Sequence, residues 1–465
     1  MAVTDAGHPT REHPVAIGSW VLAAAGFLLI GLRQSYAVPF VPLALSPGVF
    51  LPFAAAGLYL LTRVLGQRSP YRLGFLGLVL GAYLAATLIG YGAGMTRPVT
   101  PTDRADQYLI TEIALVTVVF VISTFIHNID GLVRVIQGLV AGGALTGALA
   151  CIAKFTGVEL APALKLPGLV DKGTLLSSAV VRFGQVRTQG SASHPLELGV
   201  VTSVLFPLAL GLIFYLKANE KRWWPWALAI IPLVAGGVVS FSRSAILGFV
   251  VTILIMGWRW PVRRLVIGLC LAIGSFIAGL LAGSDLITAF WSLLSQGTAE
   301  SSSQERASTW GFIFARMSEF FWFGKFQQGE GTGLSGAYPI LDNQYLTRFA
   351  DLGIMGVLTF VAVLATGVFL AFRAYRIAAD PKRAYPDLPA GTPDLFRGIA
   401  TAITVLVASS AILDIQGFTQ TYTTMWLLIG LSAVACRLAG PARKSPKASS
   451  PGSHRVGATT SATSG

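Results

Sequence analysis

The feature that most constrains this chain is a series of long apolar runs separated by short polar segments. Hydrophobic residues make up 54% of the 465 positions and charged residues only 12%, which excludes a soluble globular domain. Runs of roughly 17 to 24 residues are long enough to cross about 30 Å of hydrocarbon as helices, and they lack the strict alternation of a barrel strand. The sequence therefore predicts an all-α integral membrane protein.

We expect about twelve transmembrane helices. They lie near residues 16–32, 47–64, 73–94, 108–126, 135–155, 194–216, 223–239, 242–257, 265–283, 352–372, 398–415 and 419–436. Twelve spans put both termini on one side, which then carries 21 Lys and Arg against 7 Asp and Glu, whereas the other side carries 13 against 14. The positive-inside rule assigns the basic side, and so both termini, to the cytoplasm.

The polar segments divide the chain into four parts. Residues 1–283 hold the first nine spans with an outer loop near 156–193, and residues 284–351 form one long outer loop. Residues 352–437 hold the last three spans, and residues 438–465 are predicted to be a disordered cytoplasmic tail. Since function tends to collect in long loops, we expect the site at the outer face, and we expect the first span to be retained rather than cleaved.

The long outer loop carries a predicted amphipathic helix. Ser302-Ser303-Gln304-Glu305 matches a capping box, and a helix starting there places Trp310, Phe314, Met317 and Phe321 on one stripe. This stripe could lie on the membrane surface or against the helical bundle. The glycine-rich run Gly329–Gly333 is not followed by Gly-Lys-Ser/Thr, so it is not a phosphate-binding P-loop.

Three arginines in separate segments map to the outer face: Arg187, Arg243 and Arg306. A guanidinium group binds phosphate oxygens bidentately and keeps its charge at any physiological pH. If the three converge, they would suit a pyrophosphate group. Arg243 lies between two apolar spans, where the alternative is a side chain that snorkels to the outer head groups.

Few acid–base candidates map to the outer face. His194 precedes Pro195 at the start of a span, where it is either an interfacial helix-start residue or a substrate contact. Asp342-Asn343-Gln344-Tyr345 places a carboxylate and an amide at the outer interface, as a turn with an Asx-type cap or as a base and hydroxyl binder. The sequence shows neither metal-ligand spacing nor a Ser-His-Asp arrangement, and its three cysteines suggest no disulfide framework.

Taken in order, these motifs resemble the O-antigen ligase and polymerase family of bacterial membrane glycosyltransferases. The resemblance covers roughly residues 180 to 370, and the flanking helices match only by topology. It rests on Arg187-Thr188-Gln189-Gly190 with His194-Pro195, Ser242-Arg243-Ser244, Arg306 with Trp310, Phe323-Gly324, Gly331-Thr332-Gly333, Asp342–Leu346 and Asp351–Gly356.

The resemblance implies a GT-C-like fold in the bacterial cytoplasmic membrane. It also implies metal-independent, inverting transfer of a glycan from an undecaprenyl-pyrophosphate carrier to an acceptor hydroxyl at the outer face, without a cofactor or a nucleic-acid partner. Its partners would be the lipid-linked donor, a glycan or lipid-glycan acceptor, membrane lipids and polysaccharide-assembly proteins. Carried onto this sequence, the catalytic residues are Asp342, Arg243 and Arg306, and the substrate-binding residues are Arg187, His194, Asn343, Tyr345, Glu305 and Trp310.

The chain departs from the family pattern at two positions. Family ligases that modify lipid A core typically carry a histidine where Asp342 stands, and an asparagine is common where Leu196 follows His194-Pro195. Polymerisation of repeat units, or transfer to another surface acceptor, therefore fits as well as lipopolysaccharide ligation. Two other classes stay open: a transporter or flippase for a lipid-linked saccharide, and a non-catalytic component of a surface-polysaccharide assembly complex.

Overall fold

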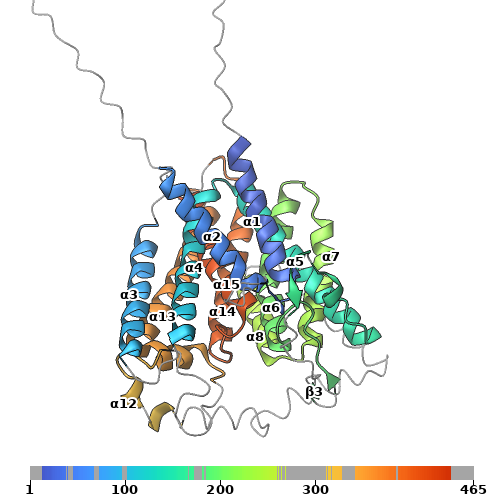
Figure 1. The fold of residues 1–465 in the computed structure, drawn as a ribbon. Coiled ribbons are helices and arrows are strands. Elements are labelled where there is room, and N and C mark those ends of the chain that lie inside the picture. Colours follow the sequence, from blue (N-terminus) through green and yellow to red (C-terminus); the bar gives the residue numbers. More distant parts are fainter. Residues whose placement is uncertain are drawn as a thin grey trace, which may run out of the picture.

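The computed structural model describes residues 13–37, 39, 46–66, 73–96, 102–165, 167–171, 181–182, 185–258, 260, 263, 268, 311, 313–315, 317–326, 341–383 and 386–440. Most of them are helical (Figure 1). The helices are α1 (His13–Gly31), α2 (Pro47–Val64), α3 (Phe75–Met95), α4 (Thr102–Phe125), α5 (Ile129–Thr156), α6 (Pro195–Ala218), α7 (Trp224–Val239), α8 (Arg243–Gly257), α12 (Met317–Phe320), α13 (Gln344–Ala379), α14 (Thr392–Ser410) and α15 (Thr419–Ala439).

The helical class predicted from composition is confirmed. Seven of the described helices are long and apolar enough to cross a membrane: α2, α3, α4, α5, α6, α13 and α15. Three shorter apolar helices accompany them: α7, α8 and the part of α1 from residue 18 to residue 31. Apart from residue 268, the expected span at 265–283 lies outside the described residues, so the count of twelve and the GT-C-like fold stay predictions.

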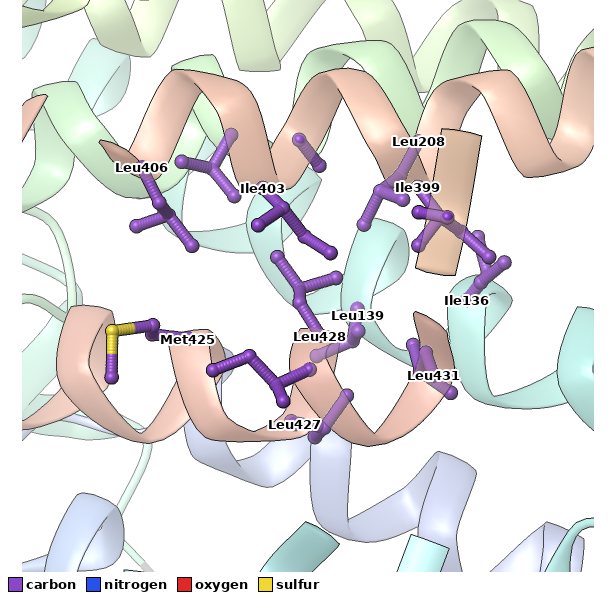
Figure 2. Packing of buried hydrophobic residues seen from close by; sticks show 14 of the residues in the cluster. Ile136, Leu139, Leu208, Ile399, Ile403, Leu406, Met425, Leu427, Leu428 and Leu431 are labelled. Atoms are coloured by element: carbon purple, nitrogen blue, oxygen red, sulfur yellow. The ribbon is translucent and has the colours of Figure 1, made fainter. Parts of the chain in front are cut away.

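The core is a bundle centred on α6 and α15, the two most deeply buried of the seven spans. α6 packs against α5, α7, α8 and α14, while α15 packs against α4 and α13. Figure 2 shows the apolar centre where side chains of four helices interdigitate, including Leu139, Leu208, Ile403 and Leu428. Because lipid tails are as apolar as these side chains, close packing rather than water exclusion holds such a bundle together.

Small residues allow the closest helix contacts. A Cβ added at Gly147 of α5 would lie 2.1 Å from the carbonyl oxygen of Pro232 in α7, and one at Gly138 would lie 2.1 Å from that of Ala23 in α1. No side chain fits at such distances, so the backbones of α1, α5 and α7 pack directly on one another. Glycine at helix interfaces is the usual means of this approach in membrane bundles.

Helix α13 begins earlier than the predicted span at 352–372 and is broken inside. It starts at Gln344, and Gly353 has non-helical angles (φ 67°, ψ −163°) that separate residues 344–352 from the long remainder. Hydropathy places the start later because Arg348 and Asp351 interrupt the apolar run. Both charged residues are nevertheless buried in the folded protein.

A short segment, residues 321–326, forms hydrogen bonds with the backbone amide and carbonyl groups that the break in α13 would leave without a partner. The amides of Lys325 and Phe326 donate to the carbonyls of Ala350 (2.6 Å) and Asp351 (2.9 Å), and the amide of Ile354 donates to the carbonyl of Phe321 (2.7 Å). Unpaired backbone groups are costly within a bilayer, so a broken membrane helix needs such a partner. The Phe323-Gly324 and Asp351–Gly356 motifs thus form one structural unit.

The predicted amphipathic helix is described only in part. Met317 and Phe321 pack against a small apolar cluster on α13, whereas Phe314 is 55% exposed. Trp310 and the predicted capping box at 302–305 lie outside the described residues. The part of the stripe from Met317 to Phe321 therefore meets the bundle, which is one of the two arrangements that the sequence left open.

We call the end of the bundle where α6, α8, α13 and α15 begin the loop end. Two pairs of short antiparallel strands lie in the loops, β1 (Tyr36–Ala37) with β2 (Val170–Asp171) and β3 (Val181–Arg182) with β4 (Gln185–Val186). A 3₁₀ turn covers Ala161–Ala163. That the loop end faces outward from the cell stays a prediction.

Candidate functional site

The loop end gathers the amino-terminal ends of several helices. His194 caps α6, Asn343 caps α13, and Ser242 occupies the position before α8. At α15, a carboxylate oxygen of the buried Glu197 accepts from the first-turn amide of Gln420 at 2.8 Å. Because helix amino termini carry partial positive charge, this end of the bundle favours anions.

At the loop end, one predicted arginine, Arg187, contacts the turn that leads to another, Arg243. Arg187 is buried, and its Nε donates to the carbonyl of Ser240 at 2.8 Å. Ser240 directly follows α7, and the partly buried Arg243 begins α8 only three residues later, within about 11 Å along the backbone. The tertiary structure thus brings two segments that are 53 residues apart into contact, and we call the region around Arg187, His194 and Arg243 the arginine–histidine site.

His194 belongs to the same site but is arranged as a hydrogen-bond donor. Its Nδ1 accepts from the amide of Leu196 at 3.1 Å, so in the neutral ring the proton sits on Nε2. Burial and the nearby Arg187 charge lower the pKa of His194 to about 4. The ring therefore stays neutral at physiological pH and offers an N–H group rather than a strong base.

The Asp342–Tyr345 motif forms the start of α13. Asn343 accepts from the amides of Tyr345 (2.9 Å) and Leu346 (3.2 Å), and its Nδ2 donates to the carbonyl of Ala411 (2.8 Å). Tyr345 points into the bundle, where its hydroxyl donates to the carbonyl of Val407 at 3.0 Å. Asn343 and Tyr345 thus hold structural contacts, and their substrate-binding role stays a prediction. Asp342 is partly buried directly before this cap.

The connection between α14 and α15, residues 411–418, links the two sides of the loop end. Beside the Asn343 contact, its Gln416 amide donates to the Gln344 side chain at 2.7 Å. At its other end, the ring of Phe418 lies 5.8 Å from the ring of His194. The arginine–histidine site and the start of α13 are therefore neighbours across one short connection.

This connection also carries Asp414, a carboxylate with a perturbed pKa. Burial, and to a lesser extent the charge of Asp351, raise the pKa of Asp414 to about 7, while Arg348 acts in the opposite direction. Its Oδ1 accepts from the amide of Gln416 at 3.2 Å. A carboxyl group that titrates near neutral pH is well matched to proton transfer.

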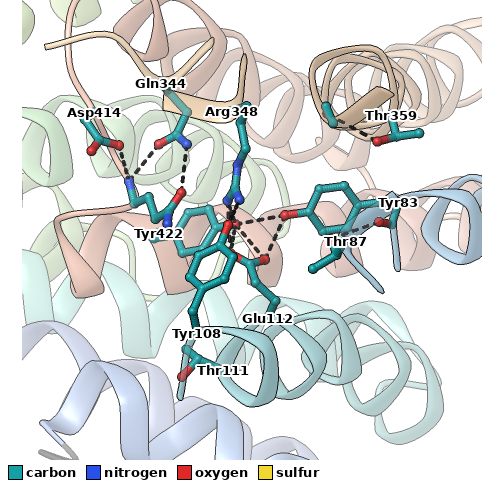
Figure 3. Close-up of polar contacts among 12 residues, drawn as sticks. Tyr83, Thr87, Tyr108, Thr111, Glu112, Gln344, Arg348, Thr359, Asp414 and Tyr422 are labelled. Atoms are coloured by element: carbon teal, nitrogen blue, oxygen red, sulfur yellow. Dashed lines mark hydrogen bonds and ion pairs between the residues drawn. The ribbon is translucent and has the colours of Figure 1, made fainter. Parts of the chain in front are cut away.

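Behind this connection lies a buried charge network (Figure 3). Arg348 of α13 forms an ion pair with Glu112 of α4 at 3.0 Å, and the exposed fractions of the two side chains are 0% and 1%. The hydroxyls of Tyr83 (2.8 Å) and Tyr422 (2.9 Å) donate to the Glu112 carboxylate, and Arg348 also bonds Tyr108 and Tyr422. Four helices, α3, α4, α13 and α15, therefore meet at one charge pair.

No role was predicted from the sequence for Glu112 or Arg348. One signal was present, since Glu112 stands inside the apolar run predicted at 108–126. A charged residue within a membrane span is a candidate functional position by default. The partner of Glu112 could not be found in this way, because Arg348 lies 236 residues further along the chain.

Three of the predicted site residues, Glu305, Arg306 and Trp310, lie outside the described residues, as does the run Gly329–Gly333. Among the residues that the structure does describe, no group of three or more His, Cys, Asp and Glu side chains could hold a metal ion. No protein-family model and no curated protein matches the chain.

Proposed function

We propose that this protein is a membrane glycosyltransferase that moves a glycan from a polyprenyl-pyrophosphate carrier to an acceptor hydroxyl. The observation that carries the proposal is the hydrogen bond from Arg187 to the Ser240 carbonyl, which places Arg187 beside the turn that bears Arg243. In this proposal the loop end faces outward from the bacterial cytoplasmic membrane, where lipid-linked glycans are assembled.

The arginines would act on the leaving group. Cleavage of the bond between the sugar and the pyrophosphate develops negative charge on the phosphate oxygens. Positioned guanidinium groups of Arg187 and Arg243 would stabilise that charge, and Arg306 would join them if its segment reaches the site. His194 would donate from Nε2 to a phosphate or sugar oxygen, consistent with its neutral ring. The bond that breaks supplies the driving force, so the proposal requires no nucleotide.

Attack by the acceptor hydroxyl requires a group to take its proton. Asp342 is the sequence candidate, and Asp414 is a second one across the 411–418 connection. General-base catalysis works best with a pKa near the working pH, and the Asp414 pKa of about 7 meets this condition better than the His194 pKa of about 4. The proton would pass from the hydroxyl to a carboxylate oxygen as the new glycosidic bond forms.

A transporter of lipid-linked saccharides is the second candidate. One observation favours it, namely the buried Arg348–Glu112 pair, because transporters place ionisable groups inside the membrane. The pair is bonded to the hydroxyls of Tyr83, Tyr108 and Tyr422, which also suits a structural connection between helices. His194 and Arg243 instead lie at helix starts, and Arg187 bonds the carbonyl of Ser240 directly after α7, as an enzyme working at the membrane surface would require.

The deciding experiment incubates the purified protein in lipid with an undecaprenyl-pyrophosphate-linked repeat unit and follows products by gel and mass spectrometry. A ladder of longer chains supports a polymerase, and product that forms only after a separate acceptor is added supports a ligase. Arg187→Ala and Arg243→Ala should lower turnover at least 100-fold, since loss of one oxyanion-stabilising group costs about that much. Arg63→Ala is the matched control, because Arg63 lies in the last turn of α2 and bonds Tyr59. Movement of donor across the bilayer without any transfer would refute the proposal in favour of the transporter.

A further inference from the structure

The turn between α7 and α8 contains a residue in an unusual conformation. Phe241 has a positive φ of 46°, and its amide donates to the carbonyl of Val238 at 3.0 Å, as in a helix carboxyl-terminal cap. Glycine usually occupies this position because a Cβ is disfavoured at positive φ. Residues that retain such strain cluster at functional sites, where the surrounding structure holds them in place. The Phe241 side chain is 1% exposed.

A lysine from a third segment meets this ring. Lys154, in the last turn of α5, places its ammonium 5.4 Å from the centroid of the Phe241 ring, within the range of a cation–π contact. The same ammonium donates to the carbonyl of Val186 at 3.0 Å. Val186 immediately precedes Arg187, and Phe241 follows the Ser240 whose carbonyl accepts from Arg187. Lys154 therefore contacts both segments that build the arginine site.

The usual attraction of a lysine to the carboxyl-terminal end of its own helix does not by itself explain the position of the Lys154 ammonium. A lysine in the last turn of a helix commonly interacts with the carbonyls of its own carboxyl terminus. Lys154 instead reaches a carbonyl 32 residues further along the chain, and an aromatic face lies beneath its ammonium. Two directional contacts fix the ammonium at the edge of the site, so less conformational freedom would be lost on binding an anion.

We propose that Lys154 is a further cation of the anion-binding site and contacts the diphosphate of the substrate, and that Phe241 is its positioning residue. This inference rests on the function proposed above. Guanidinium groups bind phosphate through a planar, bidentate contact, whereas an ammonium acts as a compact point charge. Arg187 and Arg243 together with Lys154 would therefore suit a ligand with two adjacent phosphates better than one with a single phosphate.

Titration of the purified protein in lipid nanodiscs with farnesyl diphosphate, and with farnesyl monophosphate as comparison, tests this inference. Lys154→Met should weaken diphosphate binding about tenfold, with a smaller loss for the monophosphate, and Lys154→Arg should restore most of the affinity. Phe241→Leu keeps an apolar side chain but removes the ring, so it should weaken diphosphate binding at least threefold, whereas Phe241→Tyr should retain affinity.

Lys217→Met is the matched control. Lys217 also lies over an aromatic ring, that of Trp223 at 5.2 Å, but in the last turn of α6, away from the loop end. If the wild type binds the diphosphate and Lys154→Met binds it equally well, this inference is overturned while the proposed function stands. If the wild type binds no diphosphate, both fail. Phe241→Gly relieves the positive-φ strain without supplying a ring, so a folded variant with weakened binding supports the positioning role even if Phe241→Leu does not fold.

Discussion

Removal of Glu112 should destabilise the folded protein far more than removal of an ordinary polar group. The Glu112 carboxylate accepts from Arg348 at 3.0 Å, from Tyr83 at 2.8 Å and from Tyr422 at 2.9 Å, and none of these side chains is more than 4% exposed. Glu112→Gln keeps the shape of the side chain but removes the charge that neutralises Arg348. The result is a buried guanidinium that has lost its ion-pair partner.

The expected cost follows from this geometry. Two unit charges 3.0 Å apart attract by about 5.5 kcal/mol at an effective dielectric constant of about 20. Breaking a buried pair by removing one partner costs about 3–5 kcal/mol, because the remaining charge stays desolvated. Polar contacts in membrane proteins average only about 0.6 kcal/mol, so this pair should stand well above that background.

A double-mutant cycle measures the effect. Glu112→Gln, Arg348→Met and the double variant are unfolded reversibly with increasing SDS in mixed micelles, and tryptophan fluorescence follows the transition. Each single variant should lose about 3–5 kcal/mol, whereas the double variant should regain at least about 2 kcal/mol of the summed loss. Asp380→Asn, which breaks the exposed pair of Asp380 with Arg383 at 3.3 Å, is the control and should change stability little.

Two outcomes would refute the reasoning. If each single variant loses less than about 1 kcal/mol, the pair contributes no more than a surface contact. If the losses add in the double variant, Glu112 and Arg348 act independently, and their proximity does not represent an energetic coupling.

Further predictions concern the helix break and the titrating groups of the loop end. Gly353→Ala should destabilise the protein by several kcal/mol in the same assay, because Gly353 has a φ of 67° and the new Cβ would lie 2.4 Å from the backbone of Trp322. Gly81→Ala is the control and should be neutral, because no atom lies within 4 Å of the position of its Cβ. In the folded protein Asp414 keeps its proton up to about pH 7, whereas an unperturbed aspartate releases it near pH 3.8. The stability that this group contributes should therefore be lost as the pH rises from about 3.8 to about 7. Asp414→Asn should make the stability of the protein less dependent on pH in that range. His194 should have the opposite effect on stability. Its pKa is lowered from 6.5 to about 4, so stability should be lost as the pH falls through that range. His194→Asn can still cap α6, so it should remove this pH dependence without unfolding the protein. If the dependence of stability on pH is unchanged in either variant, the shifted pKa of that residue is contradicted.

Much of the candidate site could be located from the sequence, but its connections could not. Residue type and outer-face position predict Arg187, and a place at span ends predicts His194 and Arg243. The structure brings the three residues into one region. Asp414 is not among the site residues predicted from the sequence. Its perturbed pKa depends on burial and on Asp351, which lies 63 residues earlier in the chain, so no local pattern reports it.

The sequence by itself determined the class of the protein and the position of most helices. Apolar runs and local caps such as Asn128 before α5 are properties of neighbouring residues, and they specify where a helix can form regardless of its surroundings. Tertiary structure alone decided that the charged first turns of α13 are buried and that the helix breaks at Gly353. The reason is that a buried charge or an open backbone carbonyl is tolerated only with a partner, and those partners are Glu112 on α4 and the segment at residues 321–326.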